Sequence, residues 1–175
     1  ARYAVEEAMV DLTKKKLPFH RAPELGAMIE LPAVLDIINE LAKEARFFSV
    51  GTNDLIQYML AVDRTNERVA AYYQPYHPSV LRSLHRIIQA AVKAGIEVTV
   101  CGEMGHEPEF IPFFIGAGLR TLSVDPHFLR TVQEKIVDLS VSEATDYTRA
   151  LLAEPTLEGI RKLLKSKTRQ YARVS

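Results

Sequence analysis

Four short apolar runs, separated by longer segments, constrain the fold of this chain more than any other feature. They lie at residues 24–29, 46–50, 97–100 and 121–124. The runs are short and mostly apolar, with β-branched or aromatic residues in most of them, as is typical of parallel strands buried on both faces. Their spacing leaves room for a helix after each strand, so the sequence predicts consecutive βα units.

The segments between and after these runs carry helical signals. The clearest is 79–94, where Val80, Leu84 and Ile87 form part of one apolar face at helical spacing. Pro78 before it and Gly95 after it suit the start and the end of a helix. Further helices are expected at 31–45, 108–117, 126–137, 142–153 and 156–167.

The chain length decides how much of a parallel fold these units can build. A closed eight-stranded α/β barrel typically takes about 250 residues, whereas this chain has 175. Four βα units make half of such a barrel. No linker divides the chain, so residues 1–175 are expected to form a single domain, a partial barrel. An open sheet of four strands has two unpaired edges, so it needs a missing half, a partner copy or another closure.

Composition excludes several classes of function. Lys+Arg and Asp+Glu both total 22, which gives a formal net charge of zero and argues against a nucleic-acid or anionic-membrane partner. No apolar run approaches the ~18 residues of a transmembrane helix. The single cysteine, Cys101, excludes an internal disulfide framework and fits a cytoplasmic setting.

Polar residues follow three of the four runs. Glu30 follows the first run, Asn53 and Asp54 follow the second, and Cys101 follows the third. In α/β barrels the loops after the strands form the active-site face. The alternation of elements therefore predicts that these four side chains share one rim.

Glu30 and Asp54 are the candidate ligands of a metal ion. Two carboxylates that converge on one rim repel each other unless a cation lies between them. Magnesium (Mg2+) typically takes one or two protein carboxylates together with waters and substrate oxygens. The alternative is that each carboxylate caps a helix or pairs with a basic side chain, and the spacing alone does not exclude it.

Three further features have both a functional and a plain interpretation. The turn at 51–54 suits anion binding at a helix start, but it also fits an ordinary capped turn. Arg64 suits a carboxylate or phosphate, although a solvated surface arginine is more common. Cys101 is either a small buried hydrophobe or, at a catalytic rim, a proton donor. For Arg64 and Cys101 the residues alone favour the plain interpretation.

Five blocks in a fixed order add a resemblance to a known family. They are 28–32 (MIELP), 47–58 (FFSVGTNDLIQY), 61–64 (AVDR), 77–81 (HPSVL) and 101–104 (CGEM). Together they resemble the phosphoenolpyruvate-binding domain of enzyme I of the bacterial sugar phosphotransferase system. The wider family includes pyruvate phosphate dikinase and phosphoenolpyruvate synthase. The run 60–66 (LAVDRTN) looks closer to enzyme I, including its nitrogen-regulatory paralogue.

The resemblance implies a fold and a reaction. The fold is the C-terminal half of a TIM (β/α)8 barrel followed by C-terminal helices. The reaction transfers the phosphoryl group of phosphoenolpyruvate to a histidine of a carrier protein and releases pyruvate. Glu30 and Asp54 would bind magnesium. Phosphoenolpyruvate would be held by Asn53, Asp54 and Arg64, and Cys101 would protonate the enolate carbon.

The chain also departs from the family pattern. His106 stands where a glycine is usual in the loop after the cysteine. Family members carry further substrate-binding arginines on earlier strands and a phosphorylated histidine on an N-terminal domain, through which the carrier protein would be reached. We therefore expect a C-terminal fragment of a longer cytoplasmic enzyme, inactive alone and homodimeric, since family members dimerise through this domain. The alternatives are a dimerisation or regulatory module, or the C-terminal domain of a dikinase- or synthase-type enzyme.

Overall fold

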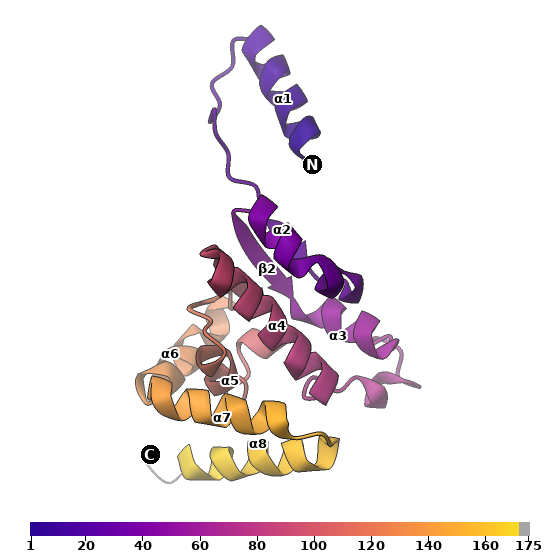
Figure 1. The fold of residues 1–175 in the computed structure, drawn as a ribbon, viewed down its shortest axis with the longest axis vertical. Helices are drawn as coiled ribbons and strands as arrows, with labels where there is room; N and C mark the ends of the chain where they lie inside the picture. Colours follow the sequence, from indigo (N-terminus) through magenta and orange to yellow (C-terminus); the bar gives the residue numbers. More distant parts are fainter. Residues whose placement is uncertain (172–175) are drawn as a thin grey trace.

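A computed structural model describes the backbone of residues 1–171 and the side chains of residues 1–165. Four strands form one parallel sheet in chain order, with β1 at Ala27–Ile29, β2 at Phe47–Gly51, β3 at Glu97–Cys101 and β4 at Thr121–Leu122. Each connection returns the chain to the same end of the sheet, and a helix accompanies each crossover (Figure 1). This arrangement confirms the predicted α/β fold class and is consistent with a partial (β/α) barrel.

The strand register brings the carboxyl ends of the first three strands into line. Ser49 of β2 lies opposite Met28 of β1 and Thr99 of β3. Two residues further on, Gly51 lies opposite Cys101. Because the strands are parallel, the residues that directly follow β1, β2 and β3 emerge at the same edge of the sheet.

The two faces of the sheet differ in their surroundings. On the helix-covered face, five strand side chains are at most 6% exposed and belong to the main core: Ile29, Phe48, Val50, Val98 and Val100. Ala27 and Leu122 on the same face are partly buried and pack against this core. On the opposite face, which we call the open face, the side chains keep partial or full exposure: Met28, Phe47, Ser49, Thr99 and Cys101. Strand side chains alternate in direction, so each strand contributes to both faces.

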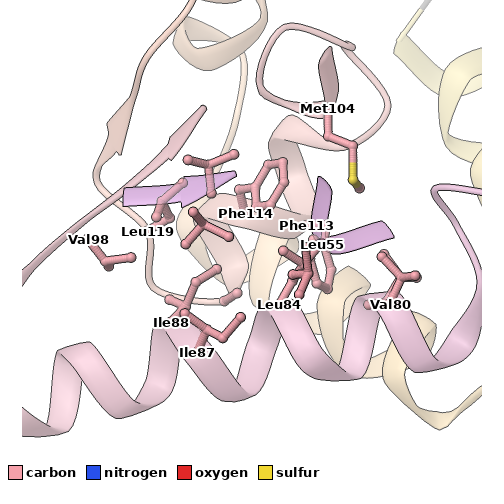
Figure 2. Close-up of a cluster of buried hydrophobic side chains, with 14 of the residues drawn as sticks. Leu55, Val80, Leu84, Ile87, Ile88, Val98, Met104, Phe113, Phe114 and Leu119 are labelled. Atoms are coloured by element: carbon pink, nitrogen blue, oxygen red, sulfur yellow. The ribbon is translucent and has the colours of Figure 1, made fainter. Parts of the chain in front are cut away.

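Helix α4 (Pro78–Ala94) supplies much of the core under the sheet. Its buried residues include Leu84, Ile87 and Ile88, which point toward Phe113, Phe114 and Leu119 in Figure 2. His77 caps its start by accepting a hydrogen bond from the Ser79 backbone N–H at 3.2 Å. Gly95 ends it in the left-handed region, at φ +69°.

The remaining helices enclose the sheet and extend beyond it. They are α2 (Ile38–Glu44) after the 3₁₀ segment η1 (Pro32–Ile37), α3 (Thr52–Leu60), α5 (Ile111–Gly116), α6 (Leu129–Val137), α7 (Val141–Ala153) and α8 (Leu157–Tyr171). Helix α7 packs closely on α5, because a Cβ on Gly116 would overlap the Ala144 carbonyl. The Thr148 hydroxyl also donates to the Phe113 carbonyl at 3.0 Å. In the described part of the chain, no helix has the length and apolarity needed to cross a bilayer.

Helix α1 (Arg2–Lys14) lies at the opposite end of the molecule from α7 and α8 (Figure 1). It contributes no buried residue. Arg2 connects it to α2 through an ion pair with Glu44 at 2.8 Å. Both side chains of that pair are largely exposed, so α1 adds little to the core.

The element bounds depart from the sequence expectation at the sheet edges. The first strand, expected at 24–29, begins only at Ala27, and the fourth, expected at 121–124, covers only Thr121–Leu122. Each edge strand pairs on one side, so its ends lack half of the ladder hydrogen bonds that define a strand. The helix expected at 108–117 begins at Ile111 for a local reason, since the preceding residues form turns.

Candidate functional site

The structure brings the predicted site residues to one edge of the sheet. Glu30 directly follows β1, Asn53 and Asp54 lie in the first turn of α3 after β2, and Cys101 is the last residue of β3. These three strands are consecutive neighbours. The rim predicted from the alternation of strands and helices therefore exists as a geometric feature.

The Glu30 carboxylate reaches across to the end of β2. Its Oε2 atom lies 3.1 Å from the position that a Cβ on Gly51 would occupy. The glycine thus leaves room for the carboxylate beside the turn that leads to Asp54. Within residues 1–165, the carboxylates of Glu30 and Asp54 have neither a hydrogen bond nor an ion pair. The position before α3 is Gly51, which provides no side-chain cap. The structure therefore shows no ion pair for either carboxylate, but Asp54 lies in the first turn of α3, where the helix dipole favours a negative charge, so this alternative stays open for Asp54.

The start of α3 is tied to the loop that follows β3. Thr52 is fully buried, and its hydroxyl donates to the Cys101 carbonyl at 2.9 Å. The Asn53 Oδ1 atom accepts a hydrogen bond from the Glu103 backbone N–H at 3.2 Å. Because Oδ1 is engaged in this way, the Asn53 amide presents its Nδ2 donors. Such donors suit the oxygens of a phosphate or a carboxylate.

Gly102 allows this close approach. Its φ is +104°, in a region that side chains rarely adopt. A Cβ there would also overlap the Thr52 hydroxyl and lie 3.1 Å from Asn53 Oδ1. Position 102 therefore requires glycine for both its backbone conformation and its surroundings.

Arg64 is also held at this rim. Its Nη1 atom forms an ion pair with Glu103 Oε1 at 2.5 Å, and its backbone N–H donates to Gln57 Oε1 at 3.3 Å. The Arg64 side chain is 37% exposed. Arg64 is therefore a surface arginine with an acidic partner, and its proposed role in substrate binding stays a prediction. Sequence reasoning assigned no role to its partner Glu103, although that residue follows β3 and the rim rule covers it.

Cys101 lies on the open face and is only partly buried. Its Sγ atom donates to the Val50 carbonyl at 3.3 Å and lies 3.5 Å from the Ser49 hydroxyl oxygen. The buried-hydrophobe interpretation does not describe this environment, because the thiol has polar partners and some solvent exposure.

Negative charge dominates the electrostatics around the loop after β3. Burial and, to a smaller extent, the nearby Glu103 carboxylate raise the pKa of Tyr73 to about 12. Burial also raises the pKa of Glu107, with added repulsion from Glu109 and Glu103. A cation at this rim would relieve such repulsion.

His106 is accommodated without distortion of the loop. Its ring stacks on Phe128, with ring centroids 4.0 Å apart and an interplanar angle of 3°. Its φ is −114°, which any residue adopts. Glycine is therefore not required at this position. The loop can adopt its conformation with histidine in place of the glycine that is usual in the family.

The donor set fits magnesium better than a metal that needs several protein ligands. In the part of the chain that the structure describes, no group of three or more His, Cys, Asp and Glu side chains is arranged so that it could hold a metal ion. Structural and catalytic zinc sites take three or four protein ligands. Magnesium keeps several waters and substrate oxygens and needs only one or two carboxylates, which Glu30 and Asp54 offer.

Comparison with known proteins identifies the class of domain. The family described as "PEP-utilising enzyme, PEP-binding domain" (PEP, phosphoenolpyruvate) matches residues 1–141. The chain therefore belongs to the PEP-utilising enzyme family, in which it corresponds to the PEP-binding domain. This result confirms the resemblance drawn from the five sequence blocks.

Curated relatives narrow the comparison to one enzyme type. The chain is 42% identical over 137 residues to the phosphoenolpyruvate-protein phosphotransferase of Bacillus subtilis, an alignment that covers 78% of this chain and 24% of the relative. It is 36% identical over 150 residues to the enzyme of that name from Borreliella burgdorferi, covering 86% and 26%. It is 41% identical over 145 residues to that of Listeria monocytogenes, covering 83% and 25%. The chain thus spans about a quarter of the length of these relatives.

Proposed function

We propose that this chain supplies the C-terminal half of a PEP-binding barrel in a phosphoenolpyruvate-protein phosphotransferase. That enzyme moves the phosphoryl group of PEP to a histidine of a carrier protein and releases pyruvate. One observation carries the proposal: Glu30, Asn53, Asp54 and Cys101 lie at the ends of consecutive parallel strands. Arg64, which follows α3, is joined to this rim by its ion pair with Glu103. The names of the curated relatives support the same reaction.

In this proposal Glu30 and Asp54 hold magnesium, and Asp54 also contributes to the substrate site through the ion. When bound, the ion neutralises charge on the phosphoryl oxygens. The Asn53 Nδ2 donors bind an oxygen of PEP. Arg64 keeps one nitrogen on Glu103 and offers its remaining N–H groups to the substrate, which suits a carboxylate or phosphate.

Cys101 completes the reaction by protonating carbon. Departure of the phosphoryl group leaves the enolate of pyruvate. The S–H bond of Cys101 breaks, a C–H bond forms at the enolate carbon, and the electron pair stays on sulfur. The partial exposure of the thiol on the open face supports this role, because a proton donor must reach the substrate.

The proposal extends to the setting of the whole enzyme. The acceptor is a histidine-containing phosphocarrier protein, of sugar uptake or of nitrogen regulation, reached through an N-terminal domain of the family. A cytoplasmic location fits the single free cysteine. The balanced charge favours neither a nucleic-acid nor a membrane partner.

Metal binding can be tested on the chain itself with Mn²⁺, which like Mg²⁺ prefers oxygen ligands in octahedral geometry. In a two-dimensional amide NMR spectrum, we expect Mn²⁺ to broaden the signals of Gly51 and Asp54 first. The double variant Glu30→Gln/Asp54→Asn should lose most of this broadening. Glu40→Gln, on the exposed side of α2, is the matched control and should keep it. Equal broadening in both variants would show that Glu30 and Asp54 are not the metal ligands.

The reaction is best tested in a chimera. The matched segment of the Bacillus subtilis enzyme is replaced by this chain, and pyruvate release is followed with PEP and the carrier protein. We expect turnover in the chimera, and its loss in Cys101→Ala with Mn²⁺ binding retained. Unchanged turnover in Cys101→Ala would exclude the thiol as the proton donor. The 175-residue chain alone is expected to release no pyruvate.

A specific observation favours homodimerisation as a second property. The two edge strands of the sheet, β1 and β4, each have only one neighbouring strand. On the open face Met28 is 53% exposed and Phe47 is 37% exposed. Unpaired edges and exposed apolar side chains favour association. Light scattering at micromolar concentration should therefore report a dimer, whereas a stable monomer would contradict this part of the proposal.

A further inference from the structure

The thiol of Cys101 has two polar neighbours on β2, the Val50 carbonyl and the Ser49 hydroxyl. Cys101 Sγ lies 3.3 Å from the Val50 carbonyl oxygen and 3.5 Å from Ser49 Oγ. Both distances are in the range of hydrogen bonds that involve sulfur. All three residues belong to adjacent paired strands, so the arrangement is built into the sheet and not into a loop.

The chemistry of the three atoms fixes the direction of each hydrogen bond. A carbonyl oxygen only accepts, so the single proton of the thiol is donated to Val50. The sulfur therefore has no second proton for Ser49. With the thiol proton on the Val50 carbonyl, the Ser49 hydroxyl is the donor to Sγ, which is one of the two directions that this contact allows.

We propose that Ser49 is a positioning residue for Cys101, whose hydroxyl orients the thiol and stabilises the thiolate. The inference rests on the proposed role of Cys101 as the proton donor. When the S–H bond breaks and the proton moves to the enolate carbon, the electron pair remains on sulfur. The Ser49 O–H group then donates to a charged acceptor, which strengthens the hydrogen bond. Solvent later returns a proton to the sulfur.

The surrounding charges make a neutral donor important at this place. Among the elements at this end of β3, β1 leads into Glu30, α3 carries Asp54 and η3 (Glu103–Gly105) carries Glu103. All three residues are acidic, and only Glu103 has a basic partner, Arg64. These charges do not supply a positively charged partner for the thiolate. Strands β2 and β4 contain no ionisable side chain, and α4 packs on the core side of the sheet.

Other hydroxyl groups do not take this role. The Thr52 hydroxyl is committed to the Cys101 carbonyl oxygen, which lies on the backbone and not on the thiol. Thr99 lies opposite Ser49 on the open face, but it belongs to the same strand as Cys101, two residues earlier. Ser49 is therefore the residue whose hydroxyl, when removed, should make the Cys101 thiolate less stable.

The test uses the pH profile of Cys101 alkylation by iodoacetamide in this chain, where the single cysteine makes the signal unambiguous. Loss of the hydroxyl in Ser49→Ala lowers the thiolate fraction near neutral pH and raises the intrinsic reactivity of the thiolate that remains. A hydrogen bond to a charged group is worth about a factor of ten in an equilibrium, and a tenfold loss of thiolate is offset about threefold by the higher nucleophilicity of the remaining thiolate. We therefore expect alkylation about threefold slower at pH 7.5 and about threefold faster above pH 10, so that the two profiles cross.

Two further variants separate the hydroxyl from packing. Ser49→Thr and Ser49→Val have nearly the same shape, and both suit a strand, but only the threonine keeps the hydroxyl. The threonine variant should follow the unsubstituted chain and the valine variant should follow Ser49→Ala. Thr99→Ala is the matched control on the open face, and its profile should not move.

The proposal is overturned if the profiles of the threonine and valine variants coincide, or if Thr99→Ala shifts the profile as much as Ser49→Ala. The measurement needs neither PEP nor metal. A chimera that releases no pyruvate would therefore not contradict the hydrogen bond between Ser49 and Cys101. Alkylation profiles that are the same with and without the Ser49 hydroxyl would not contradict the proposed phosphotransferase reaction.

Discussion

The two faces of the sheet are made by the same strands and have opposite properties. Phe48 and Val50 of β2 are fully buried on the helix-covered face, whereas Phe47 and Ser49 of the same strand lie on the open face with partial exposure. Successive strand residues alternate between the faces. The comparison teaches that the sequence position within a strand, odd or even, separates residues that stabilise the fold from residues that are available for chemistry.

The largest expected effect tests this separation within one strand. Phe48→Ala removes a side chain with 0% exposure and should lower the free energy of unfolding by about 3–5 kcal/mol. Phe47→Ala, at a position 37% exposed on the open face, is the matched control. It should lower the free energy of unfolding by only about 1 kcal/mol. Urea denaturation followed by circular dichroism measures both values. Equal losses would contradict the division into two faces.

A second test concerns the edge where the site is built. Gly102→Ala forces a side chain into a position with φ +104° and against the Thr52 hydroxyl, and we expect a loss of about 2–3 kcal/mol. Gly95→Ala is the control, because its φ is +69° but no atom lies within 4 Å of the added Cβ. It should cost only about 1–2 kcal/mol. If the two variants were equally stable, the close approach of the loop to α3 would be of no energetic importance.

A third test uses the titration of Tyr73, next to the acidic groups of the rim. Its pKa is about 12 in the folded chain, raised first by burial, against about 10 for an unfolded tyrosine. The folded state therefore holds its proton more tightly. The contribution of Tyr73 to stability is complete below pH 10 and is lost as the pH rises through 12.

Unfolding free energies measured by urea at pH 8, 10 and 11.5 test this expectation. Tyr73→Phe should show a smaller decline above pH 10 than the unsubstituted chain. Tyr72→Phe, at a position 72% exposed, should decline as the unsubstituted chain does. Parallel declines in all three proteins would show that the folded state does not raise the pKa of the Tyr73 phenol.

Much of the fold followed from the sequence, because parallel strands buried between other elements are read as short apolar runs. The placement of Glu30, Asp54 and Cys101 at one rim also followed, since topology alone aligns the ends of parallel strands. The length of β4 was not predictable in this way, because an edge strand has only one partner to define it.

Contacts between side chains at the site were beyond sequence reasoning for a different reason. The ion pair of Arg64 with Glu103 joins residues 39 positions apart, and the contact of Ser49 with Cys101 joins residues 52 positions apart. Each depends on the strand register and on side-chain rotamers, neither of which an apolar pattern determines. The sequence therefore predicted which groups meet at the rim but not how they bind one another.

The smallest expected effect on stability concerns the contact that orients a proposed substrate-binding group. Glu103→Gln breaks the ion pair with Arg64, whose side chains are 37% and 54% exposed, and exposed pairs contribute about 0.2–1 kcal/mol. Asp146→Asn on α7 breaks a comparable exposed pair with Arg149 and should cost as little. The two variants should differ in Arg64 alone: NMR relaxation of its side-chain Nε–H should report greater mobility only in Glu103→Gln. If Arg64 stays equally ordered in both, Glu103 does not hold the guanidinium at the rim.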